Sequence, residues 1–188
     1  TLTMRYFVTL LFTLTAVAAW AQQPHEKIDL WEGTTMPNSR GIVVEDSIAN
    51  HRVYKVGRPA LYRVAPTPEK NRGIAVIICP GGGYAKLSMD QEGFLMAQWL
   101  AKNGIAAFVL EYRLPNGHKE VPLEDAVEAI RIVRKKAKKF NIDPAKVGIM
   151  GFSAGGHLAG SASTIADDKD KPNFSILFYP VITANSFT

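Results

Sequence analysis

A chain of 188 residues, 47% of them hydrophobic, is long enough for one domain with a core, and this composition excludes a disordered or low-complexity protein. The net charge of +5 leaves an anionic partner to be considered, and a single cysteine excludes a disulfide within the chain.

Residues 1–21 have the pattern of a targeting segment. The positive Met4-Arg5 precedes an apolar run, which ends in the small-x-small sequence Ala19-Trp20-Ala21. The alternative is a membrane anchor, but the run is shorter than the roughly 20 residues that a span needs. We therefore predict a cleaved signal peptide, no stable insertion in a membrane, and a protein that works in the periplasm or outside the cell.

Residues 22–50 are polar and rich in turn residues, so we expect an extended lead-in with one short strand at residues 42–44. The folded domain is expected to occupy residues 51–188. It begins with two strands, residues 52–56 and 60–64, which flank Gly57-Arg58-Pro59 and could form a hairpin.

From Gly73 onward, apolar strand patterns alternate with helical patterns. The predicted strands are residues 74–79, 106–112, 147–150 and 175–179, and the predicted helices are residues 93–102, 123–140 and 154–165. The first of these strands is a continuous apolar run that includes Cys79, as expected for a strand buried on both faces. This alternation predicts an α/β fold with a doubly wound, mostly parallel sheet.

Most of the positive charge lies between Arg131 and Lys139. The apolar residues of the same segment recur at helical spacing, so the basic side chains fall on the solvated face of an amphipathic helix. No aromatic residues alternate with the basic ones as stacking platforms would. We therefore predict no nucleic-acid partner.

The sequence Gly151-Phe152-Ser153-Ala154-Gly155 follows an apolar strand and precedes a helix of small residues. This is the pattern of a nucleophile turn, in which a serine stands on a sharp bend between strand and helix. The glycines two residues to either side of Ser153 have no Cβ to clash in such a bend. The N–H of Ala154 then lies at the helix N-terminus, where an oxyanion would be stabilised.

A second glycine turn, Pro80-Gly81-Gly82-Gly83-Tyr84, follows another buried strand and should lie at the same edge of the sheet. Gly82 and Gly83 can point N–H groups at a substrate, which suits an oxyanion hole. A phosphate-binding loop is the alternative, but such a loop ends in Gly-Lys-Ser/Thr, and Gly83 is followed by Tyr-Ala.

These pieces resemble the α/β-hydrolase superfamily and, more narrowly, secreted bacterial carbohydrate esterases and acetylesterases near the hormone-sensitive-lipase-like esterases. The matching segments lie in family order between about residues 73 and 180: Pro80–Tyr84, Glu92-Gly93, Glu111–Pro115, Asp125-Ala126, Asp143-Pro144 and Gly151–Ala159. The resemblance implies a Ser-His-Asp triad with Ser153 as nucleophile, and oxyanion donors at Gly82 or Gly83 and Ala154. It implies no cofactor.

The triad order in this superfamily is Ser, Asp, His, and the sequence ends at Thr188. We therefore expect the N-terminal part of a longer hydrolase, incomplete before its last strands. His157 is expected to be a packed helix residue. His118 is a weak alternative base and, with Tyr84, a residue that could line the substrate cleft. No cluster with metal-ligand spacing occurs, so no metal is predicted.

The predicted function is hydrolysis of acetyl or other short acyl esters on plant polysaccharide such as xylan. The alternatives are a peptidase or lipid esterase of the same fold, or a catalytically incomplete hydrolase-like protein that binds carbohydrate. Trp99 is expected in the core rather than at a sugar site, because it lies in an amphipathic helix.

Overall fold

Three apolar runs form the centre of a mixed sheet. The computed structural model describes residues 25–38, 47–49 and 52–182. In this part of the chain a six-stranded sheet has the order β1-β4-β6-β5-β7-β8. Its strands are Glu26–Asp29 (β1), Ala60–Val64 (β4), Ile74–Cys79 (β5), Ile105–Glu111 (β6), Val147–Phe152 (β7) and Ser175–Phe178 (β8). Strands β6, β5, β7 and β8 are parallel, which confirms the predicted fold class.

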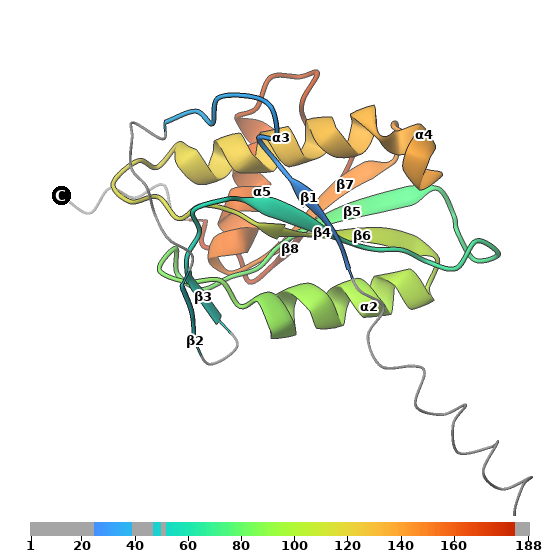
Figure 1. Cartoon of the computed structure of the whole chain (residues 1–188), viewed down its shortest axis with the longest axis horizontal. Coiled ribbons are helices and arrows are strands. Elements are labelled where there is room, and N and C mark those ends of the chain that lie inside the picture. The colour runs from blue at the N-terminus through green and yellow to red at the C-terminus, as the bar shows by residue number, and fades with distance from the viewer. Residues whose placement is uncertain (1–24, 39–46, 50–51, 183–188) are drawn as a thin grey trace, which may run out of the picture.

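Helices cover both faces of this sheet (Figure 1). Val121–Lys135 (α3), Ala137–Phe140 (α4) and Ala154–Thr164 (α5) follow β6 and β7, and α3 packs against α5. Leu95–Lys102 (α2) lies on the opposite face against β6, after a π-helical turn, Met89–Phe94 (η2). Strand β7 is buried along its whole length, and β5 and β6 are buried beyond their first residue, because helices cover both faces.

The N-terminal strands differ from the prediction. Ala60–Val64 pairs with β1 and β6, both antiparallel, whereas Arg52–Lys55 (β3) pairs with Ser47–Ala49 (β2) in a separate two-stranded sheet. The predicted hairpin between residues 52–56 and 60–64 is therefore wrong. Strand β1 lies in the segment read as a lead-in, and the expected strand at residues 42–44 lies outside the described residues, as does the predicted signal peptide.

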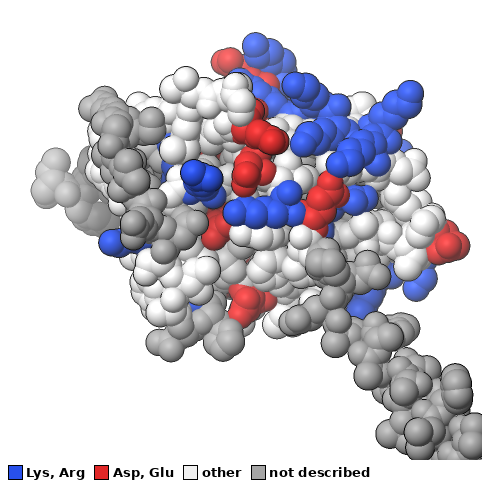
Figure 2. Space-filling model, in the orientation of Figure 1, with Lys and Arg blue, Asp and Glu red and all other residues white. Residues whose placement is uncertain are grey.

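The predicted helices are present in the structure, but they begin or end at other residues than predicted. The basic helix begins at Val121 and is interrupted at Lys136, which separates α3 from α4. Its lysines lie on the solvated side, where Figure 2 shows the basic side chains gathered over α3 and α4. Trp99, expected in the core, is 59% exposed on α2. No helix among the described residues is long and apolar enough to cross a membrane.

Candidate active site

The ends of β5 and β7 lie side by side. Cys79 pairs with Gly151 in the parallel ladder, so Pro80 and the glycines after it leave the sheet beside the turn that carries Ser153. Strand β8 ends at the same edge, because Phe152 pairs with Phe178. The glycine turn and the serine turn therefore share one edge, as predicted from the order of strands and helices.

Ser153 has an unusual backbone conformation with positive φ, at φ 52° and ψ −115°, between β7 and α5. A residue with a Cβ is strained at these angles, and such strain is concentrated at functional sites. The turn closes tightly, since a Cβ on Gly151 would lie 2.0 Å from the carbonyl oxygen of Gly155. The Ser153 N–H donates to the Phe178 carbonyl at 3.0 Å, which ties the turn to β8.

The Ser153 side chain is partly exposed, and no described residue hydrogen-bonds its hydroxyl. The N–H of Ala154, the first residue of α5, likewise donates to no acceptor among the described residues. A free N–H at a helix N-terminus beside a serine hydroxyl is a suitable donor for a negatively charged oxygen.

The glycine turn contains three successive left-handed residues: φ is 139° at Gly82, 64° at Gly83 and 56° at Tyr84. The Gly82 carbonyl accepts the N–H groups of Ala85 and Lys86, each at 3.2 Å, and this closes the turn. The N–H groups of Gly82 and Gly83 donate to no acceptor within the described ranges. Both residues predicted as oxyanion donors therefore have an N–H available for a ligand.

The side chains of Tyr112 and Glu92, for which no role was predicted from the sequence, hold the glycine turn. The buried Tyr112 hydroxyl donates to the Pro80 carbonyl at 2.7 Å, and the Gly81 N–H donates to Glu92 Oε2 at 2.7 Å. Glu92 Oε1 also accepts the Tyr179 hydroxyl at 2.9 Å, which links the turn to the segment after β8. Burial raises the pKa of the Tyr112 phenol well above its usual value, so it stays a donor at neutral pH.

Tyr84 and His157 form a pair across the two turns. The Tyr84 hydroxyl lies 2.7 Å from His157 Nδ1, and the two rings meet edge to face with centroids 5.8 Å apart. His157 is exposed on α5, so the expectation of a packed helix histidine is wrong. Burial raises the pKa of the Tyr84 phenol.

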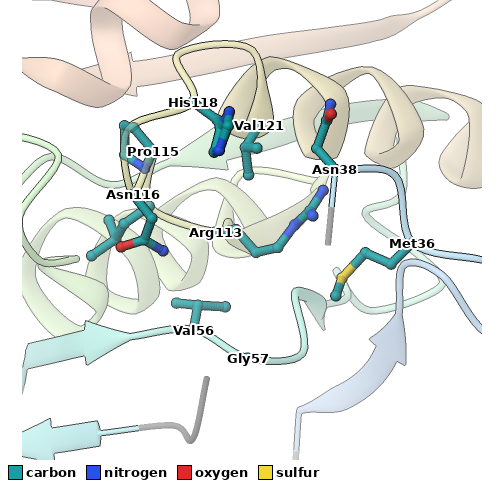
Figure 3. Close-up of a pocket in the computed structure, with 10 residues that line it drawn as sticks. Met36, Asn38, Val56, Gly57, Arg113, Pro115, Asn116, His118 and Val121 are labelled. Carbon is teal, nitrogen blue, oxygen red and sulfur yellow. The ribbon is translucent and has the colours of Figure 1, made fainter. Parts of the chain in front are cut away.

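His118 borders a pocket at the end of β6 (Figure 3). The pocket is lined by Met36, Asn38, Val56, Gly57, Arg113, Leu114, Pro115, Asn116, His118 and Val121. Neither Ser153 nor any glycine of the turn Pro80–Tyr84 lines this pocket. His118 Nδ1 instead lies 3.5 Å from Glu120 Oε1, and a role for His118 at the cleft stays a prediction.

The sequence also did not lead us to predict a buried ion pair that involves Arg113, one of the residues lining this pocket. Asp125 is fully buried and accepts both the Nη2 of Arg113, at 2.7 Å, and the indole N–H of Trp31, at 2.8 Å. A signal for it was present in the sequence. Asp125 lies four residues before the buried Ala129 and seven before the buried Ile132, so it is a charge on the buried face of its helix.

The chain is similar to several known proteins. A family model described as BD-FAE matches residues 63–179. An acetylxylan esterase of Xylanibacter ruminicola is 53% identical over 116 residues, which are 62% of this chain and 24% of that enzyme. An endo-1,4-beta-xylanase B of Butyrivibrio fibrisolvens is 42% identical over 129 residues, 60% of this chain and 20% of that one.

Among solved structures, an acetyl ester-xyloside bifunctional hydrolase from Caldicellulosiruptor lactoaceticus superposes with a TM-score of 0.69 at 34% identity. The match covers 86% of this chain and 59% of that one. The match spans only about a quarter of the Xylanibacter acetylxylan esterase and a fifth of the Butyrivibrio xylanase.

Proposed function

The chain belongs to the BD-FAE family, and from this membership and the site geometry we propose that it acts as a serine carboxylic-ester hydrolase. Its fold is that of the α/β hydrolases, as the mostly parallel sheet and the solved hydrolase indicate. The observation that carries the proposal is the strained Ser153, which stands at the same sheet edge as the N–H groups of Gly82, Gly83 and Ala154, none of which donates to an acceptor among the described residues.

In the proposed reaction, the Ser153 hydroxyl attacks the carbonyl carbon of an ester, and its proton passes to a histidine base. The carbonyl oxygen becomes an oxyanion, which the N–H groups of Gly82, Gly83 and Ala154 stabilise. Collapse of this intermediate releases the alcohol, which takes the proton from the histidine. Water then attacks the acyl-serine by the same steps and releases the acid.

The base and the carboxylate that orients it are proposed to follow Ser153 in the order Asp, then His. No histidine among the described residues hydrogen-bonds the Ser153 hydroxyl, and His157 is occupied by Tyr84. The reaction needs no metal or cofactor.

We propose acetyl or other short acyl esters on plant polysaccharide such as xylan as the substrates. The support is the acetylxylan esterase at 53% identity and the acetyl ester-xyloside hydrolase with the same fold. The protein is proposed to meet this substrate outside the cytoplasm, after removal of residues 1–21, so the mature N-terminus is expected near Gln22.

The test combines labelling with substrate choice. A fluorophosphonate probe should label the native protein at Ser153 and leave Ser153→Ala unlabelled, while acetate should be released from acetylated xylo-oligosaccharides. Rates that rise with acyl chain length would favour a lipid esterase. Absence of both labelling and hydrolysis would overturn the proposal and leave carbohydrate binding as the alternative.

A further inference from the structure

Strain in the described backbone is concentrated around the site. Six residues other than glycine have positive φ, and three are asparagines, which tolerate this region. The other three are Tyr84, Ser153 and Tyr179, which follow β5, β7 and β8 at the shared sheet edge. Ser153 is the proposed nucleophile, so the question is what holds Tyr84 in its unfavourable conformation.

The side chain of Tyr84 is held at both ends. Its ring meets Tyr112 edge to face with centroids 6.3 Å apart, and its hydroxyl lies 2.7 Å from His157 Nδ1. Tyr112 itself hydrogen-bonds Pro80, the first residue of the same turn. The tyrosine therefore connects the glycine turn to α5 through one polar contact, and His157 supplies it.

His157 also stands in a fixed relation to the nucleophile. It lies one helical turn after Ser153, and its backbone N–H donates to the Ser153 carbonyl at 2.9 Å. A contact from this residue to Tyr84 therefore fixes the glycine turn relative to the first turn of the helix that begins at the nucleophile.

The glycine turn is closed within itself. The Gly83 N–H lies in the same planar peptide group as the Gly82 carbonyl, which accepts the N–H groups of Ala85 and Lys86. A Cβ on Gly82 would lie 2.0 Å from the Lys86 carbonyl oxygen, so the chain folds back closely on this residue. Tyr84 adds an anchor outside the turn, because its hydroxyl contacts His157 on α5.

We propose that His157 is a positioning residue that, through the Tyr84 hydroxyl, holds the glycine turn and its Gly82 and Gly83 N–H groups in place for the oxyanion. This inference rests on the proposed esterase function. His157 does not touch the ester. Its contribution is made in the transition state, when charge develops on the carbonyl oxygen, rather than when the substrate binds.

The experiment compares His157→Ala with His157→Asn in the native protein, with p-nitrophenyl acetate as substrate. Alanine removes the contact, and kcat should fall about tenfold while KM changes less than twofold. The asparagine amide can replace Nδ1 opposite the tyrosine hydroxyl, so this variant should keep kcat within about threefold of wild type. Tyr84→Phe should match His157→Ala, and the double variant should be no slower than either single one.

If His157 acted only through the stability of the protein, the two variants would show the opposite order of activity. Alanine is the better helix former at this exposed position, so His157→Ala should have the higher melting temperature and would then be the more active variant. Unchanged kcat in His157→Ala, or asparagine and alanine variants equally slow, would overturn the inference while the esterase function stands. A wild-type protein without esterase activity would overturn the proposed function and this inference with it.

Discussion

Gly155 packs so closely on Cys79 that a Cβ on the glycine would lie 2.0 Å from the cysteine carbonyl oxygen. The first turn of α5 thus rests on the end of β5, where the glycine turn begins. Because the contact joins two pieces of backbone, neither side can relieve it by a change of rotamer.

Gly155→Ala is therefore expected to damage both stability and activity. The added methyl must push α5 away from β5, and overpacking of this kind costs about 1–3 kcal/mol of unfolding free energy. A shift of Ser153, the proposed nucleophile, by about 1 Å is expected to lower kcat/KM about a hundredfold. Urea denaturation and initial rates on p-nitrophenyl acetate measure the two effects.

Gly160→Ala is the matched control in the same helix. The nearest atom to its added methyl is Leu177 Cδ1 at 3.7 Å, an ordinary contact. Alanine should stabilise this helical position by about 0.5–1 kcal/mol and leave the rates unchanged. Equal behaviour of the two alanine variants would contradict the close-packing argument.

The strain at Ser153 gives a second prediction. Ser153→Ala and Ser153→Gly both remove the proposed nucleophile and should be inactive, but only glycine relieves the strain of the positive φ of 52°. After allowance for the greater flexibility of unfolded glycine, Ser153→Gly should be more stable than Ser153→Ala by about 1 kcal/mol. An alanine variant more stable than the glycine variant by about 0.4–1 kcal/mol, the contribution of unfolded-chain entropy alone, would mean that the turn carries no strain.

The sequence predicted the centre of the fold well, because the parallel strands are continuous apolar runs separated by amphipathic helices. It predicted the first strands poorly. The segments at residues 52–56 and 60–64 are close in sequence and flank turn residues, so local pattern favoured a hairpin. Pairing of Ala60–Val64 with β6, however, depends on a partner more than forty residues later, which no local pattern encodes.

The same distinction holds at the site. Ser153, Gly82 and Gly83 could be proposed from the sequence because backbone geometry demands particular residue types at fixed spacing. The residues that support them act over long separations: Glu92 reaches Gly81 and Tyr179, and Tyr112 reaches Pro80. A carboxylate in a helical turn and a tyrosine at a strand end carry no local sign of such contacts.

Glu92 provides a prediction about geometry and charge. Its two oxygens accept the Gly81 N–H and the Tyr179 hydroxyl. Glu92→Ala leaves the Gly81 N–H without its acceptor, which should cost about 1–3 kcal/mol of stability and slow ester hydrolysis at least tenfold. Glu92→Gln can keep its oxygen on Gly81 while its amide donates to Tyr179, so it should stay within about threefold of wild type. A glutamine variant as slow as alanine would mean that the negative charge itself is required.

The last prediction concerns pH and the ion pair between α3 and the segment after α5. Arg131 contacts both carboxylate oxygens of Asp170, at 3.0 and 2.6 Å, and these hydrogen bonds lower the Asp170 pKa. A lowered folded-state pKa means that the pair contributes stability above the unfolded value of about 4, and that this contribution is lost as pH falls through the folded value. Asp170→Asn should therefore be less stable than wild type by about 1 kcal/mol from pH 7 to 5, and the difference should shrink below about pH 4.

Asp168→Asn makes the same change of charge two residues away. Asp168 is 96% exposed and pairs only with Lys171, at 2.8 Å, among the described residues. Such a pair contributes little, so this variant should follow the wild-type stability at every pH. Urea titrations of the three proteins between pH 3 and 7 give the comparison. If the Asp170→Asn deficit persists unchanged at pH 3, the loss comes from packing at that position and not from the ionised pair with Arg131.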